Sequence, residues 1–247
     1  MTLSPIHRVL STFRRRKVRA LLMGGQACIL YGAAEFTRDV DLAVAVDPPN
    51  LKRLQAALRD LQAETIYFPG LSKSVLRRGH ACHFRTQSPG LHRLRIDIMS
   101  RMRGVDPFSR LWKRREEFRL PGVGIVALLA LPDLVKAKKT QRDKDWPMIR
   151  RLIEADVARH SGDADALRVD FWMRECRTVN VLRELARRYP EAARRAATGR
   201  PALREILRGG NSKAADLLRK EEDVERARDR RYWAPLRREL EKWRLGR

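Results

Sequence analysis

The sequence has few of the features that mark secreted or membrane-spanning proteins. Only three cysteines occur in 247 residues, and an odd, widely spaced set does not make a disulfide framework. No apolar run approaches the roughly 20 residues that cross a bilayer, and the longest, 123–131, contains Gly124 and ends before Pro132. The basic N-terminus is not followed by an apolar block with a cleavage site. These absences predict a cytoplasmic protein that has no membrane partner.

Acidic residues are scarce relative to basic ones. The chain has 54 Lys and Arg against 30 Asp and Glu, a formal net charge of +24. A preference for Arg over Lys does not explain this excess, because exchanging one for the other leaves the net charge unchanged. A basic surface attracts polyanions, since each phosphate contact releases counterions. The charge therefore favours a nucleic acid partner, and a solvated basic surface is the alternative.

The first half of the sequence alternates strand and helix patterns. A helix starts at Ser4 and Pro5, and a second helix opens at Pro48 and Pro49. A short helix is also expected at 26–34, and strands are expected at 18–23, 39–46, 65–68, 81–85 and 91–99. Such an order predicts a small α/β sheet with helices packed on it.

After residue 128 the strand signals disappear and Ala, Leu, Arg and Glu recur at helical spacing. Helices are predicted at 130–141, 145–160, 164–176, 178–188, 201–208 and 212–244, with breaks at glycines and prolines. We therefore expect two domains: an α/β domain over 1–125 and a basic α-helical bundle over 126–247.

Two carboxylates occupy alternate positions of the strand expected at 39–46. Because a strand alternates faces, Asp39 and Asp41 project from one side while Val40 and Leu42 enter the core. Neighbouring carboxylates repel each other unless a cation neutralises them, and Mg²⁺ binds one or two carboxylates together with water and phosphate oxygens. Gly24 and Gly25, at the preceding strand-to-helix turn, would let a triphosphate approach the backbone.

A third acid lies on a later strand. In 94–99, Leu94, Ile96 and Ile98 face one way while Asp97 faces the other. A lone buried acid is costly, and its cost falls if it joins Asp39 and Asp41 at one cation site. Taken singly, each element has a simpler explanation: a plain turn, an exposed strand edge, or an ion pair of Asp97 with a neighbouring arginine. The joint pattern predicts a metal site that assists displacement at phosphorus.

The glycine pair, the Asp-x-Asp strand and the later Asp resemble the signature of the polymerase β-like nucleotidyltransferase superfamily. Within it, the chain is most similar to the bacterial branch that contains AbiE-type toxin nucleotidyltransferases. That branch adds a helix bearing a Lys and then an Arg-x-Lys-Asp segment, which match Lys138 and Arg142–Asp145. The resemblance covers roughly residues 18–150. Two positions depart from the pattern: Glu35 replaces a frequent Arg, for which Arg38 is the substitute, and Met148 replaces a frequent Asp.

The resemblance implies an enzyme that moves a nucleotide from a nucleoside triphosphate to a hydroxyl acceptor and releases pyrophosphate. It implies two Mg²⁺ ions, or Mn²⁺ in their place, bound by Asp39, Asp41 and Asp97, with Asp97 also helping to activate the hydroxyl. Lys138 would contact the triphosphate and Asp145 would orient it. The other substrate-binding candidates are Gly24, Gly25, Gln26, Thr37, Arg38 and Arg142. Likeness to this branch raises a toxin role, with an antitoxin protein as a candidate partner. The net charge of +24 and the arginine-rich C-terminal helices favour RNA, such as transfer RNA, as the acceptor.

Other interpretations of these residues stay open. Lys138, Arg142 and Asp145 would share one face of a continuous helix, and such charged faces are often merely solvated. Thr37 would serve equally as a cap at the start of a strand. The cluster of His80, Cys82 and His83 suggests zinc, although its spacing matches no usual ligand set. The functional alternatives are transfer to a small molecule, such as an aminoglycoside, and a catalytically inactive module that binds nucleic acid.

Overall fold

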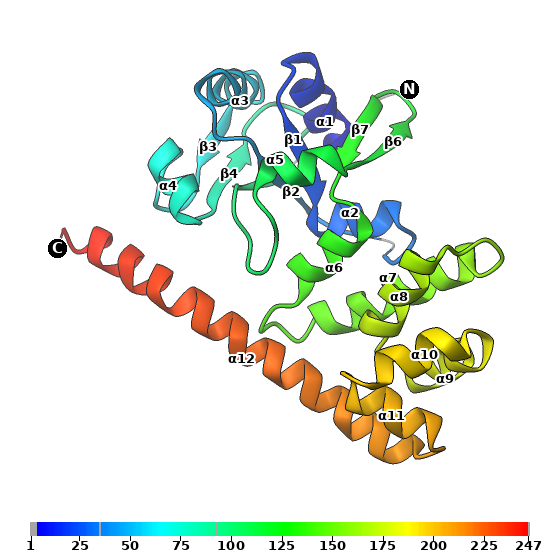
Figure 1. The fold of residues 1–247 in the computed structure, drawn as a ribbon. Coiled ribbons are helices and arrows are strands. Elements are labelled where there is room, and N and C mark those ends of the chain that lie inside the picture. Colours follow the sequence, from blue (N-terminus) through cyan, green and yellow to red (C-terminus); the bar gives the residue numbers. More distant parts are fainter. Residues whose placement is uncertain (1–3, 35, 92, 247) are drawn as a thin grey trace. The chain divides into compact units, whose positions relative to one another are not determined.

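The structure is a computed structural model that describes residues 4–34, 36–91 and 93–246. It divides into two compact units (Figure 1). The sheet unit comprises residues 1–30, 34–137 and 232–247, and the helical unit comprises 31–33 and 138–231. The chain is thus an α/β protein with a mostly helical C-terminal half, as the sequence predicts.

The sheet unit is built on a seven-stranded mixed sheet in the order β3-β4-β5-β2-β1-β7-β6. Pairing is parallel between β2 and β5 and between β1 and β7, and antiparallel elsewhere. The strands are β1 (Ala20–Met23), β2 (Asp39–Val44), β3 (Ala63–Thr65), β4 (Cys82–Thr86), β5 (Arg95–Met99), β6 (Glu116–Leu120) and β7 (Gly124–Leu128). The helices of this unit are α1 (Pro5–Arg15), α2 (Gly24–Leu30), α3 (Pro48–Asp60), α4 (Lys73–Arg78), α5 (Phe108–Lys113) and α6 (Leu131–Lys138).

Local sequence signals explain where the first helices begin. Ser4 caps α1 by accepting a hydrogen bond from the backbone of His7, and Asp47 caps α3 in the same way from Asn50. Helices α1 and α3 contact each other beside the sheet (Figure 1). The core of the unit includes fully buried aliphatic side chains from α1, α3 and the central strands: Val9, Leu54, Val40, Ile96 and Ile98.

Strands β6 and β7, which form one edge of the sheet, were not predicted from the sequence. The apolar run at 123–131 holds β7 and then the start of α6, and periodicity alone does not separate a buried strand from a helix over so few residues. Helices α4 and α5 are also absent from the prediction. The strand expected at 65–68 is displaced, since β3 ends at Thr65.

The helical unit contains α7 (Asp145–His160), α8 (Ala166–Glu175), α9 (Val179–Arg188), α10 (Pro190–Ala197), α11 (Pro201–Leu207) and the first part of α12 (Asn211–Arg244). The break predicted at Pro190 is confirmed, because α9 ends at Arg188. Helix α10, which was not predicted, begins at Pro190, in a first turn where proline needs no hydrogen-bond partner. The unit has a core around Trp172, which is fully buried and donates from Nε1 to Asp156 Oδ2 over 2.7 Å.

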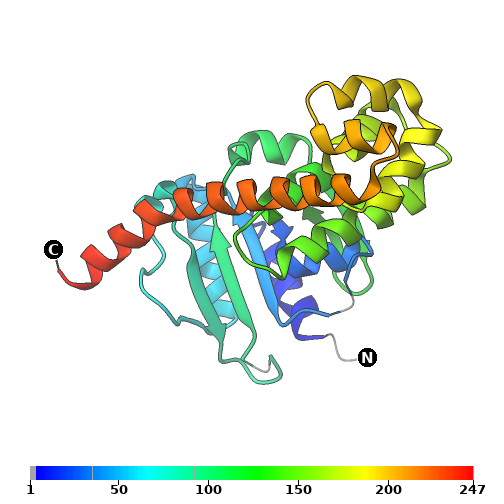
Figure 2. The ribbon, with the colours of Figure 1, turned by 90° about the horizontal axis from the view of Figure 1, so that it is seen from below.

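Helix α12 does not belong to the helical unit throughout. From Tyr232 onward its residues count with the sheet unit, and its last turns (red) lie beside α4 and β4 in both ribbon views (Figures 1 and 2). There Glu239 forms an ion pair with Arg78 and a hydrogen bond with His80, the latter at 2.7 Å. The rings of Trp243 and His80 lie 4.9 Å apart between centroids.

These two units differ from the predicted division into 1–125 and 126–247 at the boundary between the domains and at the C-terminus. The sheet unit extends through β7 and α6 to Ala137, because β7 pairs with β1 and β6. The C-terminal turns of α12, from Tyr232 onward, also belong to the sheet unit. A helical pattern shows that residues form a helix, but it does not show which domain the helix packs against.

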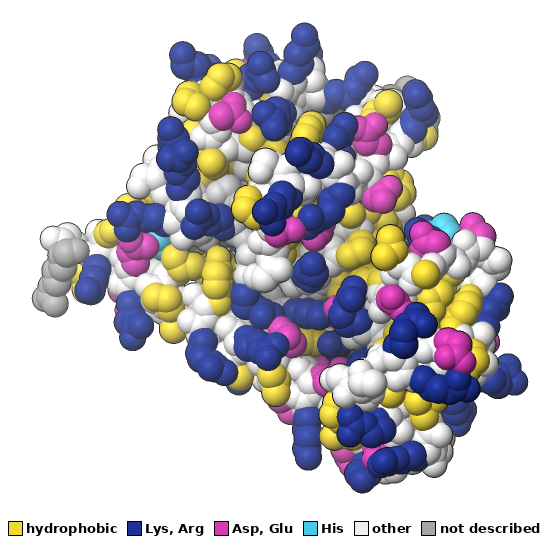
Figure 3. Space-filling view, in the orientation of Figure 1, with side chains coloured by type: hydrophobic (Ala, Val, Ile, Leu, Met, Phe, Trp, Pro, Cys, Tyr) yellow, Lys and Arg dark blue, Asp and Glu magenta, His cyan; other side chains and the backbone are white. Residues whose placement is uncertain are grey.

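The positive charge is not concentrated in the C-terminal half. The sheet unit has 29 Lys and Arg against 13 Asp and Glu, and the helical unit has 25 against 17. On the face drawn in Figure 3, basic side chains are spread over the elements of both units. Among the described residues, no helix has the length and apolar character needed to span a bilayer.

Candidate active site

The three acids expected at the site lie on two neighbouring strands. In the parallel ladder of β2 and β5, Asp41 is the register partner of Asp97, and Asp39 is the partner of Arg95. Adjacent strands are about 4.8 Å apart, so in-register side chains project side by side from one face. Asp39, Asp41 and Asp97 are partly exposed, whereas Val40 and Ile96 between them are fully buried. The predicted shared face of the three acids is confirmed.

Asp97 is held by two basic side chains. Its Oδ1 accepts hydrogen bonds from Arg95 Nε at 2.7 Å and from His83 Nδ1 at 2.8 Å. Burial tends to raise the pKa of Asp97, but these two hydrogen bonds outweigh it and hold the pKa below its ordinary value. Asp97 is therefore an ionised carboxylate whose orientation is fixed from both sides.

The glycine pair is shaped around the acid strand. Gly24 has a φ of +66°, and a Cβ built on it would lie 1.8 Å from Asp41 Oδ2. A Cβ on Gly25 would lie 2.6 Å from Thr37 Oγ1. Neither position has room for a side chain, so the glycines admit Asp41 and Thr37 against the turn. Strand alternation and the glycine pair predict an approach for phosphate at this turn, but this packing against Asp41 and Thr37 cannot be read from the sequence.

The other residues expected around the turn have distinct environments. Gln26 is buried at 8% exposure, and within the described part of the chain its Nε2 has no hydrogen-bond partner. Thr37 Oγ1 accepts from the backbone of Asp39 at 3.5 Å, as a cap at the start of the strand does. Arg38 is exposed, with its guanidinium 5.8 Å from the ring centroid of Phe36. Glu35, the position at which the family pattern departs, lies outside the described residues.

Lys138, Arg142 and Asp145 form a cluster within the helical unit. They do not share one continuous helix, as the sequence suggested, because α6 ends at Lys138 and α7 begins at Asp145. The connecting turn nevertheless brings Lys138 Nζ to 3.1 Å from Asp145 Oδ1 and Arg142 Nε to 2.8 Å from Oδ2. Asp145 is 1% exposed and also accepts from the hydroxyl of Thr140.

Burial tends to raise the pKa of Asp145, but Lys138, Thr140 and Arg142 together lower it below its ordinary value. The carboxylate therefore stays charged and orients the Lys138 ammonium. The alternative in which the three residues form a merely solvated face is wrong for Asp145, because its side chain is buried.

A pocket of about 300 Å³ adjoins the partners of Asp97. Its sheet side includes Tyr67, His83 and Arg95, and its helix side consists of α12 residues such as Trp233 and Arg237. The Arg95 guanidinium lies 5.7 Å from the ring centroid of Tyr67, and the rings of Tyr67 and His83 meet edge to face at 5.7 Å. This pocket was not found from the sequence, because it depends on the pairing of β4 with β5 and on the position of the end of α12.

The three residues considered for zinc are dispersed. His83 bonds to Asp97 and His80 bonds to Glu239, while Cys82 points to the opposite side of β4 into the core. Burial raises the pKa of the Cys82 thiol to about 11, which disfavours the thiolate that zinc requires.

The donor set on β2 suits a hard cation. Among the described residues, no three His, Cys, Asp or Glu side chains are gathered into a metal-holding group. Asp39 and Asp41 supply the one or two carboxylates that Mg²⁺ takes when phosphate and water oxygens complete its shell. The unpartnered amide of the buried Gln26 at the adjoining turn adds a donor for an oxygen-rich ligand.

Comparison with known proteins assigns no family: no protein-family model matches the sequence, and no curated protein matches it significantly. A functional inference for this chain therefore depends on its own motif residues and on their geometry.

Proposed function

We propose that this protein is a Mg²⁺-dependent nucleotidyltransferase of the polymerase β-like type, which moves a nucleotide from a nucleoside triphosphate to a hydroxyl of an RNA acceptor. The observation that carries the proposal is the in-register pairing of Asp41 with Asp97 on adjacent parallel strands, with Asp39 on the same face. Three acids on one partly exposed face are costly for folding, and this cost argues for a role in binding or chemistry.

In this proposal Asp39 and Asp41 hold the metal, which supplies charge neutralisation for the triphosphate and for displacement at phosphorus. Asp97 accepts the proton of the acceptor hydroxyl, while Arg95 and His83 keep it ionised and oriented. Gln26 Nε2 at the glycine turn donates to a phosphate oxygen. The contact of Lys138 with the triphosphate stays a prediction from the sequence; within the helical unit, Asp145 orients the Lys138 ammonium.

The pocket beside Asp97 supports RNA as the acceptor class. It combines the ring of Tyr67 with Arg95 and Arg237, and such a combination of aromatic and guanidinium groups stacks a base and neutralises its phosphate. Its position next to His83 and Arg95, the two partners of Asp97, would bring a hydroxyl of the same nucleotide toward the acid.

The test is transfer of label from each α-³²P-labelled nucleoside triphosphate to RNA by the full chain, with Mg²⁺ present. Asp41→Asn, an isosteric change, is expected to abolish transfer, whereas Glu116→Gln, an exposed acid on β6, is expected to leave it unchanged. Retention of full activity by Asp41→Asn would overturn the proposal, and so would the absence of label on any acceptor with the wild-type protein.

A second candidate is a catalytically inactive module that binds nucleic acid. It is favoured by one observation: Arg95 and His83 already occupy Asp97 Oδ1, so this acid is compensated without a metal. Under this alternative the wild-type protein and Asp41→Asn would bind RNA equally and neither would transfer label.

A further inference from the structure

A second, larger pocket lies wholly within the helical unit. Its volume is about 790 Å³, within the range of small-molecule sites. Its lining residues come from the ends of α8 and α10, the start of α11 and the middle of α12. Its described lining residues all lie between Lys139 and Arg228, away from β2 and β5 in the sequence, so a ligand bound here does not depend on nucleotide transfer.

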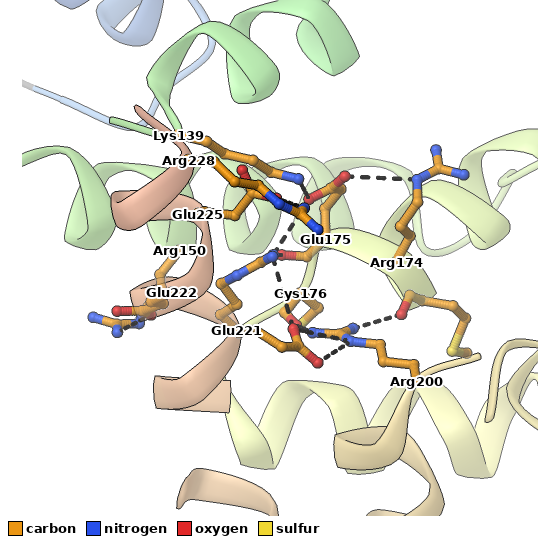
Figure 4. Close-up of polar contacts among 12 residues, drawn as sticks. Lys139, Arg150, Arg174, Glu175, Cys176, Arg200, Glu221, Glu222, Glu225 and Arg228 are labelled. Atoms are coloured by element: carbon orange, nitrogen blue, oxygen red, sulfur yellow. Dashed lines mark hydrogen bonds and ion pairs between the residues drawn. The ribbon is translucent and has the colours of Figure 1, made fainter. Parts of the chain in front are cut away.

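The floor of this pocket is a buried ionic network. Lys139 Nζ lies 2.7 Å from Glu175 Oε2, and Arg177 lies 3.3 Å from the same oxygen. On the other side, Arg200 pairs with Glu221 at 2.9 Å and donates to the carbonyl of Cys176 at 2.6 Å (Figure 4).

The network and its surroundings have more positive than negative charge. Three carboxylates, Glu175, Glu221 and Glu225, face the five cations Lys139, Arg174, Arg177, Arg200 and Arg228, and the whole lining has seven basic side chains against four acidic ones. Arg177 is only 5% exposed as a side chain, and within the described residues its Nε has no hydrogen-bond partner. Burial lowers the pKa of Lys139 although Glu175 acts against it. Buried cations without full compensation are expensive, and a bound anion would remove that cost.

The rest of the lining is apolar. Met173, Leu217 and Val224 contribute aliphatic surface, and Val224 is 49% exposed. None of the described residues that line the pocket is aromatic, so the pocket offers no ring on which a base would stack. A ligand that complements both the basic floor and the aliphatic side of the lining has a multiply charged anionic group at one end and an apolar body at the other.

We propose that this pocket binds a small phosphate ester with an apolar body, its phosphate directed at the Lys139–Arg177 floor and its body against Met173, Leu217 and Val224. The excess of three basic side chains matches a phosphate better than a single carboxylate. Arg228, on α12, also lines the pocket and adds a further positive charge for the phosphate.

The probe is 1-naphthyl phosphate, titrated calorimetrically into the full-length protein, with 1-naphthol and inorganic phosphate as the two partial ligands. Naphthyl phosphate is expected to bind saturably and more tightly than either partial ligand. Arg228→Glu is expected to weaken its binding about tenfold, the factor that corresponds to losing one charge-assisted contact.

Arg219→Glu is the matched control. Both arginines are exposed on α12 and both pair with a carboxylate three residues earlier, Arg219 with Asp216 and Arg228 with Glu225, but Arg219 does not line the pocket. Arg219→Glu is expected to bind as the wild type does. Equal weakening in both variants, equal affinity for 1-naphthol, or no saturable binding by the wild type would overturn the proposal. Asp41→Asn separates the two proposals, since it is expected to lose nucleotide transfer and to keep this binding.

Discussion

Arg95 donates from Nε to Oδ1 of Asp97 over 2.7 Å, and the two residues lie two positions apart on the same strand. Because side chains at this spacing share a face, the arginine lies beside the acid and orients it. We expect Arg95→Ala to lower kcat for nucleotide transfer about tenfold, within the range seen when an orienting partner is removed. The Michaelis constant for the nucleoside triphosphate should change little.

Steady-state kinetics with varied triphosphate and fixed RNA measure both constants. Arg95→Lys keeps a donor near Asp97 and should recover part of the loss, whereas Arg119→Ala, on the edge strand β6, should behave as the wild type. Wild-type kcat in Arg95→Ala would show that this hydrogen bond has no part in activity.

Gly24 offers a test of the packing around Asp41. Because its φ is +66° and a Cβ would lie 1.8 Å from Asp41 Oδ2, alanine at this position is strained and displaces the carboxylate. We expect Gly24→Ala to lower the free energy of unfolding by about 2 kcal/mol and to abolish transfer. Gly70→Ala is the control, because a Cβ there meets nothing within 4 Å. Urea unfolding compares the two variants, and equal stabilities would contradict this geometry.

Asp145 gives the helical unit a pH-dependent component of stability. Its pKa in the folded protein is lowered from the ordinary 3.8, so its contribution is present above that value and is lost as the pH falls through the lower, folded pKa. At pH 7 we expect Asp145→Asn to cost roughly 3 kcal/mol, as removal of one partner from a buried ion pair does.

The stability difference between Asp145→Asn and the wild type should shrink as unfolding is measured at progressively lower pH below 4. Asp143→Asn is the control: its side chain is 98% exposed and pairs with Arg226 at the surface, so its loss should cost about 0.5 kcal/mol. A difference for Asp145→Asn that does not depend on pH would mean that the ion pairs do not stabilise the fold.

The shared face of Asp39, Asp41 and Asp97 could be predicted from the sequence because strand alternation is a local property. An arginine partner for Asp97 could also be anticipated, because Arg95 lies two positions away on the same strand. His83 could not: it reaches Asp97 only because β4 pairs with β5 in one particular register, and register depends on the packing of the whole sheet. A shift of one residue would have placed Cys82 beside the acid instead.

The prediction for the Lys138 segment was right about the grouping and wrong about its cause. Lys138 and Asp145 lie on either side of a turn that separates two helices, and the ion pair between the Lys138 ammonium and the buried Asp145 carboxylate holds them in contact. For α12, the sequence gives a helix through to residue 244, but only tertiary contacts such as His80 with Glu239 show that its end belongs to the sheet unit.

Substitution of Tyr67 tests whether the pocket beside Asp97 binds the RNA acceptor. If its ring stacks on a base of the RNA, Tyr67→Ala should raise the Michaelis constant for RNA about tenfold, since stacking of one base contributes roughly 1–3 kcal/mol. The constant for the triphosphate should stay the same. Tyr67→Phe keeps the ring and should retain wild-type values. A change of the same size for RNA and triphosphate would assign Tyr67 to the stability of the sheet and not to the acceptor.

Arginines of the helical unit differ in whether a carboxylate pairs with them, and this difference predicts which of them are available to RNA. Arg200 is buried at 8% exposure and serves the fold, so it does not belong to an RNA surface. Arg183, Arg187 and Arg188 on α9 are the better candidates, because no ion pair with a carboxylate engages them among the described residues. By contrast, Arg194, Arg208 and Arg219 each pair with a carboxylate three residues earlier.

Replacing the three α9 arginines by Gln should weaken RNA binding and reduce the log–log salt slope by about two, because each phosphate contact contributes roughly 0.7 to 0.9. The triple variant of Arg194, Arg208 and Arg219 removes the same formal charge and should change the slope less, since their charges are already compensated by neighbouring acids. Fluorescence anisotropy with labelled transfer RNA over a range of salt concentrations measures both slopes. Equal slopes for the two triple variants would mean that total charge, and not the α9 surface, determines RNA binding.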